Sequence, residues 1–361
     1  MLVLGIESSC DETAASLVED GFTVRSSVIS SQIAKHAQFG GVVPELAARE
    51  HLKNIAPVVE SALREAGVSL KDIDAVGVTN RPGLVPALLV GNAYAKGLAA
   101  ARDIPIVGIN HFLGHIYGAF LENKELLEDK NNFPILALVV SGGHTAIVKI
   151  PADGKASILG STLDDAAGEA LDKAAKALGL PYPGGPVIDR LSKEGNPAAF
   201  AFPRSLTGAA GKAVSPEHRF DFSFSGVKTS LLYALKGDES IVQTRLNDLA
   251  ASFQEAVIDV LDMKSRDAAK AIGAKVVCLC GGVACNSRLR EKIAVSCQKR
   301  GRRFVCAPPK YCTDNAAMIG GLAWHYLKHG GNADDFGINA RLEPSLGTLP
   351  FAPLATAPKM A

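Results

Sequence analysis

The spacing of hydrophobic and polar residues predicts an ordered series of strands and helices along the first third of the chain. Short apolar runs are typical of buried strands, whereas apolar residues recurring every three or four positions are typical of helices. By these criteria a strand, a hairpin, a helix, a strand, a helix and a strand follow one another at residues 2–7, 13–30, 44–67, 74–80, 81–102 and 105–110. Asp20-Gly21 supplies the turn of the hairpin, and Pro44 occupies the first turn of the first helix, where proline is favoured.

The rest of the chain repeats this order. A strand, a Ser-Gly-Gly turn and a second strand come first, then a strand, two helices, a strand, a helix and a strand, at residues 134–150, 157–162, 166–179, 252–273, 275–282, 286–301 and 303–308. Residues 181–226, rich in Pro, Gly, Ser and Phe, interrupt the repeat, and we expect them to form a long functional loop rather than a packed element. The repetition predicts an α/β fold of two duplicated units with a cleft between them, where ligands usually bind.

The composition fits a folded protein of two domains. The 361 residues exceed the usual size of one hydrophobic core, and 47% hydrophobic against 21% charged residues argues against disorder. The formal net charge of +1 does not indicate nucleic-acid binding, so any such contact needs a local basic patch. One candidate patch is Gln298–Arg303, for which a solvated turn is the favoured interpretation. Another borders the insert and contains Lys212, His218, Arg219 and Lys228.

The cysteines and the N-terminal residues bear on the compartment. Seven cysteines at irregular spacing argue against a disulfide framework and favour a reducing environment. The N-terminal residues MLVLGIESSCDET lack the basic segment of a signal peptide. No apolar run approaches the roughly 20 residues that a membrane helix requires. We therefore expect a cytoplasmic protein with no membrane contact.

Two histidines, His111 and His115, lie four residues apart in NHFLGH, a spacing that places both rings on one face of a helix. Such pairs hold transition metals, and zinc proteases use the related motif HExxH. Here Phe112 occupies the position of the catalytic glutamate, which argues against proteolysis. The spacing does not decide between a metal site and two ordinary histidines, because His325 and His329 share it at a helix end, where we expect a structural or exposed pair.

Acidic residues stand near several of the predicted turns, and each has an ordinary alternative. Asp314 is a candidate third metal ligand, or equally the N-cap of the next helix. Asp11 and Glu12, in ESSCDET, are placed to contact a metal or accept a proton, or else belong to a polar hairpin. Asp172 precedes a Pro-Gly-Gly-Pro turn and Asp189 follows it. Asp172 is a candidate for binding ribose or substrate hydroxyls, or an exposed helix acid.

Two glycine turns have features that suit a nucleotide. In VVSGGHT, residues 139–145, adjacent glycines let the backbone approach a ligand, and Ser141 adds a hydroxyl. An ordinary glycine hairpin would have the same sequence pattern. In CGGVACNSRLR, residues 280–290, a strand leads through Gly-Gly into a helix whose free N–H groups suit an adenosine or phosphate group. Asn286 either caps this helix or contacts the ligand. Neither turn matches GxGxxG or GxxxxGK[ST], so neither a dinucleotide fold nor a P-loop is supported.

An ordered series of motifs, spanning roughly residues 2–344, resembles the TsaD family of tRNA threonylcarbamoyladenosine transferases. The motifs are GIESSCDET, FGGVVPELAAREH, RPGLVPALLVG, NHFLGH, LVVSGGHT, DDAAGEALDKAAKALGLPYPGGP, FDFSFSGVKT, GGVACNSRLR and CTDNAAMIG. The resemblance implies two duplicated actin-like, sugar-kinase-like (ribonuclease-H-like) domains, in agreement with the repeat. We expect these domains at residues 1–110 and 111–324, with the insert 181–226 in the second and a C-terminal helix at about 325–345 packed on the first.

The resemblance also implies a reaction and its partners. A family member transfers the threonylcarbamoyl group from threonylcarbamoyl-adenylate, made by another enzyme, to N6 of adenosine 37 in tRNAs that read ANN codons, and releases AMP. The implied partners are the tRNA anticodon loop, a smaller inactive paralogue and a P-loop ATPase. Alternatives are a metalloprotease of HxxxH type and a non-catalytic actin-like ATPase module.

By matching positions, the resemblance assigns roles to individual residues. His111, His115 and Asp314 match metal ligands, for iron(II) or else zinc or magnesium. The contacts to the substrate adenylate, or to an ATP-type ligand, match Val139, Val140, Ser141, Gly142, Gly143, Asp172, Gly185, Asp189 and Asn286. Asp11 and Glu12 match an acidic pair that assists catalysis.

The sequence departs from the family pattern in two places that bear on function. Leu113 and Gly114 stand where many relatives have Glu-Gly, which leaves the metal ligands intact but removes a carboxylate between them. The segment Thr207–Arg219 is longer than in many relatives, so tRNA contacts there are not assigned.

Overall fold

The computed structural model describes residues 1–153, 155–208, 214–237, 240–329, 333–334 and 338–340, which form two compact units. Unit 1 comprises Met1–Asn132, Pro151–Ala156 and the described residues from Ala307 onward. Unit 2 comprises Phe133–Ile150 and Ser157–Cys306. Each unit is built around its own five-stranded sheet.

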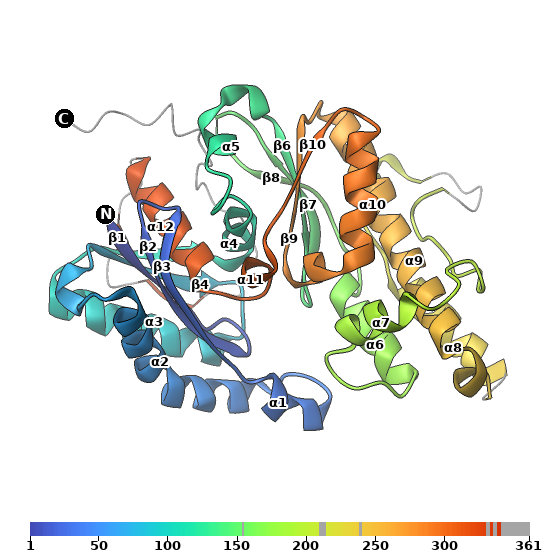
Figure 1. The fold of residues 1–361 in the computed structure, drawn as a ribbon, viewed down its shortest axis with the longest axis horizontal. Coiled ribbons are helices and arrows are strands. Elements are labelled where there is room, and N and C mark those ends of the chain that lie inside the picture. The colour runs from blue at the N-terminus through green and yellow to red at the C-terminus, as the bar shows by residue number, and fades with distance from the viewer. Residues whose placement is uncertain (154, 209–213, 238–239, 330–332, 335–337, 341–361) are drawn as a thin grey trace. The chain divides into compact units, whose positions relative to one another are not determined.

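The sheet of unit 1 has the strand order β3-β2-β1-β4-β5 (Figure 1). Its strands are β1 (Leu2–Glu7), β2 (Glu12–Glu19), β3 (Thr23–Ser31), β4 (Ala75–Arg81) and β5 (Ile106–Asn110). The first three strands pair antiparallel, whereas β1, β4 and β5 pair in parallel. Asp20 and Gly21 have φ angles of 48° and 77° between β2 and β3, so the predicted hairpin turn is confirmed.

The sheet of unit 2 repeats this topology strand for strand. Its order is β10-β9-β6-β7-β8, with β6 (Ile135–Val140), β7 (Thr145–Ile150), β8 (Ser157–Ser161), β9 (Val276–Cys280) and β10 (Arg303–Cys306). Again the first three strands pair antiparallel, and β6, β9 and β10 pair in parallel. The predicted duplication is therefore confirmed.

The helices of unit 1 cover both faces of its sheet. They are α1 (Ile33–His36), α2 (Pro44–Ala66), α3 (Val85–Arg102), α4 (His111–Gly118), α5 (Glu125–Glu128), α11 (Pro309–Cys312) and α12 (Ala317–Lys328). Alternate strand residues such as Leu4 and Val76 join α2 and α3 in one hydrophobic core. On β1, Gly5 lies between the core residues Leu4 and Ile6 and faces α12. A Cβ on Gly5 would lie only 2.1 Å from the carbonyl oxygen of Ala316. The sheet thus accepts α12 only because this position carries no side chain.

The division into units differs from the expected domain boundary at residue 110. Helix α4, expected to open the second domain, belongs to unit 1 together with α11 and α12. The physical reason is packing, since α12 contacts β1, β2 and β4 of the first sheet and also α4. Of the helix expected at about residues 325–345, α12 covers the beginning as far as Lys328, and most of the remainder lies outside the described residues.

The helices of unit 2 correct one expectation about the insert. They are α6 (Ala167–Ala177), α7 (Gly184–Ser192), α8 (Ser225–Gly237), α9 (Ile241–Ala271) and α10 (Ser287–Gln298). The insert 181–226 is not simply a loop, because it contains α7, whose Ile188 is fully buried where α7 packs on α9. The Pro- and Gly-rich composition did not predict this helix, because Ile188 is the one large apolar side chain of α7 that is fully buried.

Short 3-10 helices lie between several of the longer elements. The 3-10 helices are η1 (Ala37–Phe39), η2 (Leu70–Asp72), η3 (Lys130–Asn132), η4 (Pro216–His218) and η5 (Gly282–Cys285). Within Thr207–Arg219, residues 209–213, and with them Lys212, lie outside the described part of the chain. Among the described helices, none combines the length and apolar character that a bilayer crossing requires.

Candidate metal centre and adenylate-binding turns

Helix α4 places His111 and His115 side by side, as their spacing predicts. The helix begins directly after β5, where the side chain of Asn110 accepts a hydrogen bond from the backbone N–H of Leu113 at 3.1 Å and caps the first turn. The two imidazole centroids are 4.5 Å apart, and both side chains are buried. Leu113 is fully buried in the apolar core, which explains how a leucine is accommodated at this position.

Asp314 lies between α11 and α12 and approaches both histidines. Its Oδ1 is 3.4 Å from Nε2 of His111 and 3.2 Å from Nε2 of His115. The neighbouring Asn315, not Asp314, accepts the hydrogen bond from the N–H of Met318 at the start of α12, at 3.1 Å. The N-cap alternative for Asp314 is therefore wrong, and its carboxylate is left to face the two imidazoles.

Glu7 is a residue of this centre that the sequence reasoning missed. It ends β1, is fully buried, and its Oε2 accepts a hydrogen bond from Nδ1 of His111 at 3.0 Å. The same carboxylate accepts from the hydroxyl of Thr79 at 2.5 Å and from the N–H of Ser9 at 2.6 Å. With Nδ1 carrying the proton, Nε2 of His111 is the nitrogen available to a ligand. The available signal was a glutamate at the end of an otherwise apolar strand.

The donor set and its surroundings fit a metal ion. His111, His115 and Asp314 each offer one ligand atom, and these atoms lie within 4.8 Å of one another. Nδ1 of His115 is buried without a hydrogen-bond partner among the described residues, and Nε2 has only the nearby carboxylate of Asp314, an arrangement that is costly unless a ligand is bound. This His-His-Asp group could therefore hold a divalent cation.

The pKa values in this group reflect burial and mutual charge. Burial lowers the pKa of His111, but the carboxylates of Asp314 and Glu7 outweigh it and hold that pKa well above its usual value. Burial and the neighbouring His111 lower the pKa of His115. Burial raises the pKa of Asp314, yet the two imidazoles outweigh burial and hold it well below its ordinary range. An imidazolium between carboxylates is the charge pattern that a cation can replace.

In the same unit, Asp11 ends the loop after β1, and Glu12 is the first residue of β2. Burial, the charge of Asp314 and that of Asp11 raise the pKa of Glu12 to about 9. A second histidine anchors the loop: Nε2 of His51 donates to the carbonyl of Cys10 at 3.0 Å, and Nδ1 accepts from the hydroxyl of Thr13 at 2.7 Å. The structure therefore brings Glu12 within electrostatic reach of Asp314, one of the candidate metal ligands.

In unit 2, the turn after β6 meets two other glycine-bearing segments. A Cβ at Gly168, in α6, would lie 2.6 Å from the carbonyl oxygen of Ser141. A Cβ at Gly281, which has φ of 91°, would lie 2.4 Å from the carbonyl oxygen of Val140. The turn Val139–Gly143 thus lies at the carboxyl ends of the parallel strands β6 and β9, beside the start of α6. Ligands of open α/β sheets bind at such strand ends.

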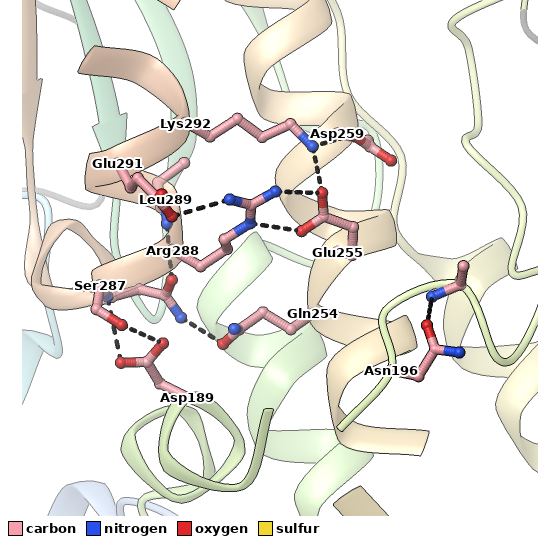
Figure 2. Close-up of polar contacts among 12 residues, drawn as sticks. Asp189, Asn196, Gln254, Glu255, Asp259, Ser287, Arg288, Leu289, Glu291 and Lys292 are labelled. Carbon is pink, nitrogen blue, oxygen red and sulfur yellow. Dashed lines mark hydrogen bonds and ion pairs between the residues drawn. The ribbon is translucent and has the colours of Figure 1, made fainter. Parts of the chain in front are cut away.

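Asp172 and Asp189 both bind backbone N–H groups of neighbouring turns. Oδ1 of Asp172 accepts from the N–H groups of Gly184 and Gly185, at 2.7 and 3.2 Å, so this residue is not an exposed helix acid but holds the Pro-Gly-Gly-Pro turn. Burial raises the pKa of Asp172. Asp189 accepts from the backbone N–H of Ser287 at 3.2 Å and from its hydroxyl at 3.0 Å (Figure 2).

Asn286 caps α10 and is fixed by a glutamine that the sequence reasoning missed. Its Oδ1 accepts from the N–H of Leu289 at 2.9 Å, and its Nδ2 donates to Oε1 of the buried Gln254 at 2.6 Å. Beside these residues lies a hollow of about 470 Å³, whose polar lining includes Asp189, Gln254 and Ser287 (Figure 2). The cap interpretation is confirmed, and it leaves one amide hydrogen of Asn286 for a ligand.

The second histidine pair behaves as expected of structural residues. His325 is fully buried in α12, and its ring lies 5.6 Å from that of Tyr117 and 4.2 Å from that of His329. Among the described residues, neither belongs to a group of three or more candidate metal ligands. Because the two pairs have the same spacing, this spacing alone does not identify a metal site, and a third donor must lie nearby.

Comparison with known proteins identifies close relatives of the whole chain. The sequence model of the TsaD family, described as tRNA N6-adenosine threonylcarbamoyltransferase, matches residues 23–321. The tRNA N6-adenosine threonylcarbamoyltransferase of Syntrophotalea carbinolica is 50% identical over 342 residues, which cover 94% of this chain and 96% of the relative. That of Geobacter strain M21 is 50% identical over 327 residues, covering 91% and 92%.

A solved structure supports the fold assignment separately. Component A of the (R)-2-hydroxyglutaryl-CoA dehydratase of Acidaminococcus fermentans matches with a TM-score of 0.53 and 13% identity, over 90% of this chain and 98% of that chain. At this identity the likeness concerns the fold alone, and it confirms the expected actin-like ATPase fold. The sequence matches carry further. The chain belongs to the TsaD family of tRNA N6-adenosine threonylcarbamoyltransferases, the enzymes that form threonylcarbamoyladenosine at position 37 of tRNA.

Proposed function

We propose that this transferase binds one divalent metal ion, iron(II), through His111, His115 and Asp314. The observation that carries the proposal is the convergence of these three donors, with His111 oriented by Glu7. Two imidazoles and one carboxylate form the ligand set typical of non-haem iron(II), although zinc accepts the same donors. When bound, the ion supplies positive charge that offsets the charge of the substrate phosphate and of the departing AMP.

We further propose that unit 2 binds threonylcarbamoyl-adenylate through the turn Val139–Gly143, Asp172, Gly185, Asp189 and Asn286. The two glycines Gly142 and Gly143 are exposed and have open space at the Cβ position, so their backbone N–H groups are accessible to a ligand. Asp189 and Gln254, the partner of Asn286, line the 470 Å³ hollow, which is large enough for a nucleoside.

The chemistry explains why an adenylate and a base are both needed. The exocyclic amine of adenine is a weak nucleophile, because its lone pair is delocalised into the ring, and the mixed anhydride supplies an activated acyl group. Attack by N6 on the carbamoyl carbon forms the new C–N bond, and cleavage of the bond from that carbon to the phosphate oxygen releases AMP. The proton lost from N6 passes to Asp11 or Glu12. Because its pKa is raised to about 9, Glu12 is protonated at neutral pH in the ligand-free protein, which favours Asp11 as the acceptor of this proton. Adenosine 37 lies in a single-stranded loop, so it reaches the enzyme without breaking a duplex.

The family membership suggests the setting of the reaction. We propose that the enzyme works in the cytoplasm with a smaller inactive paralogue and a P-loop ATPase. The described cysteines are free, as suits a reducing compartment.

The test combines metal analysis with reconstituted transfer. His111→Ala should fold normally, lose its bound metal by elemental mass spectrometry, and lose most transfer of threonylcarbamoyl from the adenylate to tRNA. His329→Ala, a histidine outside the proposed site, is the control and should retain both. Full metal occupancy in His111→Ala would show that the ion is bound elsewhere.

A further inference from the structure

A basic hollow of about 550 Å³ lies in unit 2, apart from the metal centre and the adenylate-binding turns, and it includes two arginines of the basic turn Gln298–Arg303. Two segments form it, the C-terminal part of α9 and the turn between α10 and β10. Its lining consists of Met263, Arg266, Asp267, Lys270, Arg300 and Arg302. Four of these six residues are cationic, whereas the whole chain has a net charge of only +1. The hollow is therefore a local concentration of positive charge on a nearly neutral protein.

The carboxylates near the hollow are already engaged with arginines. Asp267 forms two hydrogen bonds of 2.7 Å with the guanidinium of Arg219. The buried Asp262 lies 3.2 Å from Nε of Arg266. Each of these two acids pairs with one arginine. Among the described residues, the other cations of the lining, Lys270, Arg300 and Arg302, have no carboxylate within ion-pair distance.

Two of these three cations, Arg300 and Arg302, are held in place by neutral groups. Arg300 donates to the carbonyl of Ser296 at 2.8 Å, and Nε of Arg302 donates to the carbonyl of Ala274 at 3.1 Å. Such bonds fix the guanidinium groups without neutralising them, so their remaining N–H groups stay available to an anion. Lys270 and Arg300 are exposed. Further exposed cations flank the hollow at Lys275 and Lys299.

We propose that this basic hollow binds the sugar-phosphate backbone of the tRNA substrate. The proposal rests on the transferase function and adds a contact surface to it. A polyanion fits better than a small anion, because the charges come from two segments and continue beyond the hollow to Lys275 and Lys299. An RNA backbone presents phosphates at regular intervals and matches such a spread of lysines and arginines.

The position of the hollow suits backbone contacts away from the reacting base. Asn286 caps one end of α10 and the turn containing Arg300 follows the other end. The 12 residues of this helix span roughly 18 Å at 1.5 Å per residue. Contacts at that distance fix the orientation of the RNA and carry no sequence information. This is what an enzyme needs if it acts on several tRNAs that share only the target adenosine and its immediate context.

The experiment measures binding of unmodified tRNA to the purified full-length chain over roughly 50–200 mM salt. The test variant is Lys270→Glu/Arg300→Glu, and Lys270→Gln/Arg300→Gln is the milder version should charge reversal impair folding. The control is Lys155→Glu/Lys236→Glu, which makes the same charge change at exposed lysines elsewhere. Thermal unfolding confirms that every variant is folded.

We expect the test variant to bind tRNA about tenfold more weakly, with a salt slope reduced by roughly 2, or about 1 for each lost phosphate contact. In the transfer assay KM for tRNA should rise while kcat at saturating tRNA is retained. The control should bind within about twofold of the wild type. Unchanged tRNA affinity and salt slope in the test variant would overturn the proposal. If that variant lost binding to an acidic protein partner while tRNA binding was unchanged, the hollow would be a protein-binding surface, and the proposal would be overturned as well. Because binding is measured without turnover, this result is independent of whether the metal and adenylate assignments hold.

Discussion

The carboxylate of Glu7 accepts a hydrogen bond from Nδ1 of His111 at 3.0 Å, across 104 positions of sequence. Glu7 ends the first strand and His111 begins α4 directly after the last strand of the same sheet, so the fold itself creates the pair. A carboxylate behind a histidine fixes the tautomer and makes the other nitrogen a better ligand.

Replacing Glu7 tests this arrangement. Glu7→Gln keeps the shape of the side chain but removes its charge, so we expect metal affinity to fall roughly 10- to 100-fold while the fold is retained. Competition with a chelator of known affinity measures the change. Glu60→Gln, on the exposed face of α2, is the matched control. Equal metal affinity in the two variants would mean that Glu7 does not orient a ligand.

Asn286 allows the cap and the binding role to be separated. Asn286→Asp preserves an acceptor for the N–H of Leu289, and aspartate is as good an N-cap as asparagine, so stability should change by less than about 1 kcal/mol. The variant loses both amide hydrogens, and the amide of Gln254 can turn so that its NH2 group donates to the new carboxylate, which repels the adenylate phosphate. We expect about tenfold weaker binding of AMP, measured by calorimetry with the Asp189→Asn variant in parallel. Unchanged AMP affinity would assign Asn286 a purely structural role.

Gly5 links the first sheet to the loop that carries Asp314. In Gly5→Ala the new methyl would lie 2.1 Å from the carbonyl oxygen of Ala316, two residues beyond Asp314. The helix must shift, which should cost about 1–3 kcal/mol of unfolding free energy and weaken metal binding as well. The control is Gly97→Ala, in the exposed middle of α3, where a Cβ meets nothing and a gain of up to about 1 kcal/mol is expected. Denaturant unfolding of both variants provides the measurement, and similar stabilities would contradict the close packing of α12.

A charge network between α9 and α10 predicts a pH-dependent contribution to stability. Arg288 donates twice to Glu255 at 2.9 Å, and Lys292 donates once at 2.5 Å (Figure 2). Burial raises the pKa of Glu255, but the hydrogen bonds from Arg288 and Lys292 outweigh it and lower the pKa to about 2. A pKa below the unfolded value of 4.5 means that the ionised carboxylate stabilises the fold above pH 4.5, and that this contribution is lost as pH falls toward 2.

Glu255→Gln should therefore lose on the order of 2 kcal/mol at pH 7. The stability difference from the wild type should shrink as the pH is lowered through the range from 4.5 to about 2. Urea unfolding at several pH values measures it. A difference that is constant with pH would show that the loss comes from packing and not from charge.

Much of the fold could be predicted from the sequence because the strands are short, buried and bounded by turns. The hairpin at Asp20-Gly21 and the helix beginning at Pro44 have strong local signals, and the structure confirms both. By contrast, α7 lies within a segment rich in Pro and Gly, and it depends on tertiary packing against α9 and α6, in which Ile188 is fully buried and which no local pattern reports. The assignment of α12 to unit 1 likewise depends on packing against glycines of distant strands.

The candidate site likewise contains residues that the sequence predicts and residues that it does not. The ligand type and spacing of His111 and His115 were visible in the sequence, but the same spacing at His325 and His329 showed that it was not sufficient. The sequence offered Asp314 as a third ligand or an N-cap, and the resemblance to the TsaD family implied the ligand. The structure explains this outcome, since Asn315 caps the helix instead. Glu7 and Gln254 were missed because their roles consist of contacts with residues far away in the sequence.

The central claim is that this chain forms threonylcarbamoyladenosine through the His111, His115 and Asp314 site. The most direct test is to deplete the protein in its host, complement with wild type or His115→Ala, and quantify threonylcarbamoyladenosine in bulk tRNA by mass spectrometry. We predict that the modified nucleoside falls on depletion, returns with the wild type and does not return with an equally abundant, folded His115→Ala. An unchanged level on depletion would contradict the function, and full restoration by His115→Ala would contradict the site.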